Sequence, residues 1–336
     1  MVTRRKHLSC PRRVHFEWGR YDTFAESWLR QKPLYDALLS SRPLQRLRRI
    51  RFLGAIDSFW ETPLMPPRAH LSRFNHTVGV AYLMSRGSRY LGHNAAKTDM
   101  LVCAALLHDI GHGALSHSTE PAFERKLGLN HKTIGKRLIL GNILSGLEIH
   151  RILEGFEVDP DNVCRTIDCA PCADENRLLA NPINVDTIDG ILRTMSFFEP
   201  EEPIFAPEMI LEFAISPSAS NCYAGDYFWN LKDKTYTRYI SIDPWAARDL
   251  AITAALESCS SDISERDFLL TDDTFYRKFH PALRREQRNG RRTATESKFR
   301  PTRPRFRYLI DTHIEPTDPR NLERRYTKRS IALADA

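Results

Sequence analysis

Several features that define whole classes of proteins are scarce or missing in this sequence. The 336 residues include only 15 glycines, fewer than a turn-rich sheet protein of this size would use, which favours a mostly helical fold. The longest apolar run, Met100 to Leu107, has eight residues and is too short to span a membrane. No apolar segment of a signal peptide follows the basic N-terminus. We therefore expect a cytoplasmic protein that does not associate with membranes.

The cysteines do not indicate a disulfide framework, because the chain is long and the seven cysteines are an odd number. Cys164, Cys169 and Cys172 are spaced like half of a structural zinc site. No second pair of cysteines or histidines follows at the spacing that such a site requires. We interpret these three residues as free thiols in a loop.

Positive charge is concentrated near the C-terminus. Residues 277–329 contain 17 Lys and Arg against 6 Asp and Glu, a net +11, which leaves about −4 for the rest of a chain whose total is +7. Because prolines interrupt this region, we expect 281–336 to be an irregular basic extension with one strand near 308–314, following a domain of residues 1–280. Such a cluster suits an anionic partner: a nucleotide effector, nucleic acid or an acidic neighbouring subunit. A solvated basic face is the alternative.

Hydrophobic spacing predicts helices along most of the first 280 residues. Short helices are expected between 23 and 53. Longer ones are expected at 75–86, 99–109, 119–127, 131–145, 147–154, 161–168, 185–196, 207–214, 245–258 and 273–279. The helix after Thr98, its expected N-cap, is apolar on every side and should be buried. Residues 223–242 are ambiguous between helix and strand, and 55–71 read as a loop or hairpin with several prolines.

A group of histidines and aspartates begins in the predicted helix at 75–86, continues at the end of the buried helix and extends to residue 189. A hydrolytic metal site needs neutral imidazoles and carboxylates, with positions left open for water and substrate. The candidates are His76, His108, Asp109, His112, His117, His131, Asp186 and Asp189. Residue types alone leave two interpretations open: one metal site, or unrelated histidines that cap helices or lie on the surface.

Four strings occur in a specific order: PLQRLRRIRFLG at 43–54, SRFNHTVGVAYL at 72–83, LLHDIGHGALSH at 106–117 and NVDTID at 184–189. Together they resemble the HD-domain superfamily, and closely its deoxynucleoside triphosphate triphosphohydrolase branch, over residues 14–280. This resemblance implies a mainly α fold, a helical bundle around a metal site, followed here by the small β-containing extension. It also implies a homo-oligomer.

The resemblance implies a role for each matching residue. His76, His108, Asp109 and Asp186 match the ligands of the catalytic metal. Two imidazoles and two carboxylates suit Mn, Fe, Co, Ni or Mg, with Mn or Mg favoured.

His112, His117 and His131 match positions that line the phosphate channel of these enzymes. His117, oriented by Glu120, resembles the general acid that protonates the leaving oxygen, and Arg73 matches an arginine that clamps phosphate. Ordinary helix capping is the alternative for His131 and Glu120.

The chain departs from the branch on the side of the pocket that holds the nucleoside. Thr187 replaces a basic residue, Gly190 replaces an aromatic ring, and Thr194 replaces an acidic residue that binds the sugar. Phe52 stands where a glutamine is common. We expect Gly190 to enlarge the pocket. Tyr236 resembles a tyrosine that stacks on the sugar, and Lys232 or Lys234 would restore the lost phosphate charge.

These features favour hydrolysis of a nucleotide substrate, with a dNTP giving deoxynucleoside and triphosphate. A first alternative is an HD phosphohydrolase or phosphodiesterase acting on another nucleotide, a second messenger or a nucleic-acid end. A second alternative is a non-catalytic nucleotide sensor or nucleic-acid-binding protein.

Overall fold

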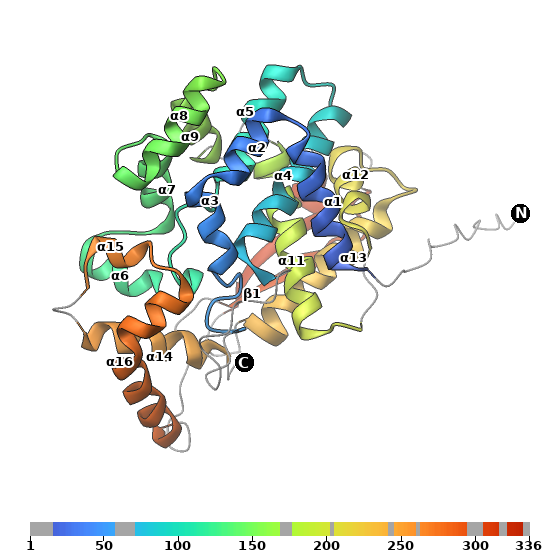
Figure 1. Ribbon diagram of the computed structural model, residues 1–336. Helices are drawn as coiled ribbons and strands as arrows, with labels where there is room; N and C mark the ends of the chain where they lie inside the picture. The colour runs from blue at the N-terminus through green and yellow to red at the C-terminus, as the bar shows by residue number, and fades with distance from the viewer. Residues whose placement is uncertain are drawn as a thin grey trace, which may run out of the picture.

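The protein is mainly helical in a computed structural model (Figure 1). The structure describes residues 16–57, 71–168, 177–201, 205–240, 245–259, 263–293, 305–315 and 321–331. The predicted proline-rich loop falls largely on 58–70, outside the described residues, as do Cys169 and Cys172 of the cysteine cluster. Cys164 is a free, buried thiol.

The helices of the N-terminal half are α1 (Trp18–Arg30), α2 (Pro33–Ser40), α3 (Arg42–Arg46), η1 (Leu47–Arg49), α4 (Arg73–Tyr90), α5 (Ala95–Leu107), η3 (Ser116–Ser118), α6 (Glu120–Leu127), α7 (His131–Ile139), η4 (Leu144–Gly146), α8 (Leu147–Gly155) and α9 (Pro160–Asp168). Those of the C-terminal half are α10 (Arg177–Ala180), α11 (Val185–Phe198), α12 (Pro207–Ile215), α13 (Cys222–Thr235), the π-helical turn η6 (Tyr236–Ile240), α14 (Trp245–Ser258), α15 (Glu265–Phe268), α16 (Asp272–Thr293) and α17 (Leu322–Arg325). Two strands, β1 (Arg305–Ile310) and β2 (Tyr326–Ile331), form an antiparallel pair.

Helix α4 lies in the middle of the bundle, where it packs against α1, α5, α11 and α12 (Figure 1). Helix α5 is buried along its second half, as its apolar pattern predicts. The predicted start of α5 at Thr98 is wrong. Asn94 caps the helix instead, because its side chain accepts a hydrogen bond from the backbone N–H of Lys97 at 2.9 Å.

The segment 223–242, ambiguous in the sequence, is helical as far as it is described. The buried residues of α13 include Ala224, Phe228 and Leu231, which follow one another at intervals of three and four residues. This spacing places them on one face of a helix, and the face packs against α11 and α12.

The described part of the C-terminal extension contains more regular secondary structure than the sequence predicts. Helix α16 continues through Pro281 to Thr293, so the predicted boundary after 280 falls inside a helix. The predicted strand begins earlier, as β1, and pairs with β2 in the register Tyr308↔Lys328. This hairpin packs on α13, where the Trp229 indole donates to the Leu309 carbonyl at 3.1 Å.

No helix in the described part of the chain is long and apolar enough to cross a membrane.

Candidate metal centre

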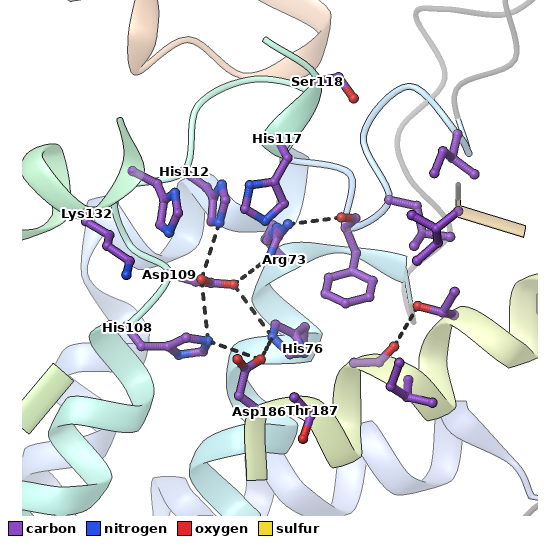
Figure 2. A pocket seen from close by; sticks show the side chains of 18 of the residues that line it. Arg73, His76, His108, Asp109, His112, His117, Ser118, Lys132, Asp186 and Thr187 are labelled. Atoms are coloured by element: carbon purple, nitrogen blue, oxygen red, sulfur yellow. Dashed lines mark hydrogen bonds and ion pairs between the residues drawn. The ribbon is translucent and has the colours of Figure 1, made fainter. Parts of the chain in front are cut away.

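The four predicted metal ligands meet at one point, although they come from three helices. His76 lies in α4, His108 and Asp109 follow the last turn of α5, and Asp186 is in the first turn of α11. Nε2 of His76 is 3.2 Å from Oδ1 of Asp186 and 3.6 Å from Oδ2 of Asp109. Nε2 of His108 is 3.5 Å from Oδ1 of Asp109 (Figure 2).

Both imidazoles are held through Nδ1, and Nε2 of each faces the centre. Nδ1 of His108 lies 2.8 Å from the Ala105 carbonyl, and its buried Nε2 has no hydrogen-bond partner. Nδ1 of His76 is engaged by Asp189. One donor atom each from His76, His108 and Asp186 lie within 4.8 Å of one another, close to the spread that three ligands of one ion require at about 2.1 Å. The donor set therefore fits a divalent metal.

The charges around the centre favour ionised carboxylates. Burial would raise the pKa of Asp186, but a hydrogen bond to His76 and the proximity of His108 outweigh it and lower this pKa to about 2. Burial likewise opposes ionisation of Asp109, yet His108 and Arg73 hold the pKa of Asp109 well below its usual range. Burial by itself would lower the pKa of His76. Its hydrogen bonds to Asp186 and Asp189 outweigh this effect and raise the pKa to about 9. A metal at this centre therefore competes with a proton on His76.

A buried ionic network lies behind His76, and it includes Asp189, which is among the candidates for the metal site in the sequence. Oδ1 of Asp189 lies 2.8 Å from Nδ1 of His76 and 2.5 Å from Nε of Arg193. Arg193, which is completely buried, also donates to Asp22 at 2.6 Å. A Cβ at Gly79 would lie 1.9 Å from Asp189 Oδ2, so glycine is required for α4 and α11 to approach this closely. The signal available in the sequence is the i, i+4 spacing of Asp189 and Arg193 on one helix.

The remaining predicted catalytic residues form a second cluster on the adjacent side of the cavity. His131 Nδ1 lies 2.6 Å from Glu120 Oε2, whereas His117 Nδ1 is 3.9 Å from Glu120 Oε1. Glu120 therefore bonds to His131. The sequence predicts that Glu120 orients His117, but His117 lies farther from it. His112 is buried, and its Nε2 is 3.3 Å from Asp109 Oδ1, which connects this cluster to the metal centre (Figure 2).

Donor atoms of His112, His117, Glu120 and His131 also lie within 4.8 Å of one another, but two of these rings are not oriented to share a metal ion. The rings of His112 and His131 are stacked, with centroids 4.3 Å apart and planes only 6° from parallel. Imidazole binds a metal through a lone pair in the ring plane, so two stacked rings cannot both point at one ion. Burial and the nearby Arg73 hold the pKa of His112 well below its usual range, which keeps this ring neutral. The cluster is better suited to hydrogen bonding and proton transfer.

A cavity of about 480 Å³ opens onto both groups of residues. Arg73 lines it, but its guanidinium is already held by Asp109 at 2.6 Å, Ser116 at 2.8 Å and the Phe52 carbonyl at 3.2 Å. Tyr236 also lines the cavity. Lys232 does not, because its ammonium group is buried beside the Trp229 ring and donates to the Pro182 carbonyl at 3.3 Å.

The ring of Phe52 lies in part of the space expected beside Gly190. A Cβ at Gly190 would lie 3.3 Å from Cζ of Phe52, whose ring also packs on His76 with centroids 4.5 Å apart. The hydroxyl of Thr194 donates to the Gly190 carbonyl at 2.7 Å. Phe52 therefore takes up part of the volume that the missing side chain leaves, while Gly190 itself still lines the cavity.

One segment in the first half of the chain is similar to a known protein family. Residues 73–168 match the family model of the HD domain. An uncharacterized protein of Bacillus subtilis, YwfO, is 35% identical over 136 residues, which cover 39% of this chain and 29% of the relative. The deoxynucleoside triphosphate triphosphohydrolase SAMHD1 of Gallus gallus is 28% identical over 135 residues, covering 37% of this chain and 21% of the relative. The chain spans less than a third of the length of both relatives. Residues 73–168 are thus similar to the HD domain, which is found in a superfamily of metal-dependent phosphohydrolases.

Proposed function

We propose that this protein hydrolyses nucleotides in the manner of a dNTP triphosphohydrolase, converting a dNTP and water to deoxynucleoside and triphosphate. The convergence of His76, His108, Asp109 and Asp186 beside a cluster of imidazoles carries the proposal. The similarity to a relative named deoxynucleoside triphosphate triphosphohydrolase supports the choice of substrate. The cavity, at about 480 Å³, is within the range of about 300–1,000 Å³ typical of small-molecule sites.

The reaction replaces the bond between the α-phosphorus and the sugar O5′ with a bond to the oxygen of water. A divalent metal held by the four ligands would supply a nucleophilic water at neutral pH and polarise a phosphoryl oxygen. Arg73 is placed to hold a phosphate oxygen with the two N–H groups that it does not use on protein acceptors.

His117 is the candidate for the proton donor to O5′. Its side chain is 55% exposed and lines the cavity, so it can exchange protons with solvent between turnovers. Imidazole is suited to this role because it ordinarily titrates near neutral pH. His131, fixed by Glu120, packs against His117 with ring centroids 5.3 Å apart and limits the orientations of that ring.

A second candidate function is hydrolysis of a different phosphate ester, such as another nucleotide, a second messenger or a nucleic-acid end. The observation that favours it is the lack of a charged side chain at Thr187 and Thr194, which line the cavity next to the metal ligands. The intact ligand set argues against a third candidate, a nucleotide sensor or nucleic-acid-binding protein without catalysis.

The decisive experiment incubates the purified protein with Mn²⁺ and a panel of dNTPs, NTPs, 2′,3′-dideoxynucleoside triphosphates and cyclic dinucleotides, and identifies the products by mass. We expect deoxynucleoside and tripolyphosphate from dNTPs. Release of nucleoside monophosphate, or cleavage of cyclic dinucleotides alone, would support the second candidate. A pocket that hydrogen-bonds the 3′-hydroxyl should reject the dideoxy analogue by about 10⁴-fold.

A further inference from the structure

In the described part of the chain, one cation that lines the cavity is not neutralised by a neighbouring side chain. Among the described residues, the arginine and lysine side chains that line it are Arg73 and Lys132. Arg73 is buried and donates to three protein acceptors. Lys132 is exposed, and no ion pair or hydrogen bond joins its ammonium group to any residue in the described part of the chain.

Lys132 is the second residue of α7, directly after His131. Figure 2 shows its side chain extending toward the side of the cavity where His108 and Asp109 lie. The approach of α7 depends on Gly111, because a Cβ there would lie 1.9 Å from the His131 carbonyl oxygen and 2.4 Å from the backbone nitrogen of Gly135. The HD segment therefore fixes where Lys132 enters the cavity.

Among the described residues, those of α11 that line the cavity include no lysine or arginine. Thr187 follows the metal ligand Asp186, and its hydroxyl lies 3.1 Å from the Asn184 carbonyl and 3.3 Å from the Asn184 nitrogen. This is the capping box of α11, so the hydroxyl is already used to begin the helix. A phosphate group bound between α7 and α11 would therefore contact the lysine of α7, Lys132.

We propose that Lys132 binds the phosphate chain of the substrate, at a phosphate other than the one attacked, and that the enzyme selects polyphosphate esters for this reason. The proposal rests on the proposed function of the same site. A lysine is a flexible point charge, so it follows a phosphate oxygen without imposing the geometry of an arginine fork. Because it does not touch the bonds that form and break, it should stabilise the bound substrate and the transition state about equally.

The test compares Lys132→Met and Lys132→Arg with Lys136→Met. Lys136 is the matched control, because it is exposed one turn further along α7 and lines only a side cavity of about 10 Å³, the size of one water molecule. Isothermal titration measures binding of inorganic tripolyphosphate in excess Mg²⁺, which prevents the probe from stripping the protein's metal. Steady-state kinetics with a dNTP separates kcat from KM.

We expect Lys132→Met to weaken tripolyphosphate binding and raise KM about 10-fold or more, with kcat changed less than about 3-fold. Lys132→Arg should retain most of the affinity, and Lys136→Met should match the wild type. Equal tripolyphosphate affinity in Lys132→Met and wild type, or no binding by the wild type, would overturn the proposal. If tripolyphosphate binding depends on Lys132 but no dNTP is cleaved, the proposed function fails while the phosphate site stands.

Discussion

Oδ1 of Asp189 lies 2.8 Å from Nδ1 of His76, and this contact determines which nitrogen of His76 faces the metal centre. A carboxylate at Nδ1 holds the proton there in the metal-bound state and leaves the lone pair of Nε2 for the ion. Arg193 in turn fixes Asp189 and is itself fixed by Asp22. The orientation of this ligand, His76, thus depends on Asp189, a buried side chain that is not itself among the predicted metal ligands.

Asp189→Asn should lower metal affinity by about 10–100-fold, the usual cost of losing a hydrogen-bonded partner of a ligating histidine. The amide keeps the shape of the carboxylate but no longer stabilises the proton on His76 Nδ1. Titration of the metal-stripped protein with Co²⁺, followed by its visible absorption, would measure the change.

Asp22→Asn is the matched control, because Asp22 pairs with the same Arg193 but does not touch His76. Both variants break a buried ion pair and should lose about 3–5 kcal/mol of stability. Only Asp189→Asn should lose metal affinity. Equal losses of affinity in the two variants would mean that Asp189 acts on stability alone.

His108→Ala and Asp109→Ala should each abolish hydrolysis and reduce the bound metal. These side chains line the cavity and are not part of the hydrophobic core. Far-ultraviolet circular dichroism should therefore show a folded protein. Elemental analysis after dialysis gives the metal content. Full activity in metal-stripped His108→Ala would contradict the ligand assignment.

His117→Ala should lower kcat by about 10²–10⁴-fold, the range expected when a general acid is lost. Its metal content should remain near that of the wild type, because His117 meets His112 edge to face in the imidazole cluster and does not belong to the group formed by His76, His108 and Asp186. Loss of metal in this variant would instead assign His117 to the support of the metal centre.

The attachment of the β1–β2 hairpin to α13 should depend on one buried arginine. Arg325 donates to both carboxylate oxygens of Asp226 on α13, at 2.8 and 2.6 Å, and its side chain is 6% exposed. Arg325→Ala should therefore cost about 3 kcal/mol, since it removes the cation that pairs with Asp226 and leaves the Tyr326 hydroxyl as the remaining donor to that carboxylate. The exposed neighbour Arg324 is the control, and Arg324→Ala should leave Tm nearly unchanged in thermal unfolding.

The basic extension is best tested by removing residues 294–336, because a cut at 281 would divide α16. We expect the truncated protein to be less stable and, if the extension joins subunits or binds an effector, to form smaller assemblies with lower activity. Light scattering and hydrolysis assays measure both. Unchanged size and hydrolysis, together with loss of nucleic-acid binding that weakens steeply with salt, would assign the extension to nucleic acid.

The sequence was sufficient for the parts of the protein that local patterns control. Helical spacing predicted most of the helices up to 280, because amphipathic and buried helices carry a period of 3.6 residues. The start of α5 after Asn94 was not predicted, since Asn94 and Thr98 are both good caps and the local pattern does not choose between them. The end of the helical region at 280 was also misjudged, because Pro281 does not stop α16.

At the site, the sequence alone determined which residue types are present and in what order. The HD string and its neighbours predicted His76, His108, Asp109 and Asp186 as one metal centre, and the structure brings these four together. Only the tertiary structure decided that Phe52 takes up part of the space beside Gly190, that Glu120 holds His131, and that Lys132 rather than Lys232 reaches the cavity. These relationships join residues from different helices, and their distances depend on how the helices pack, which no local pattern in the chain encodes.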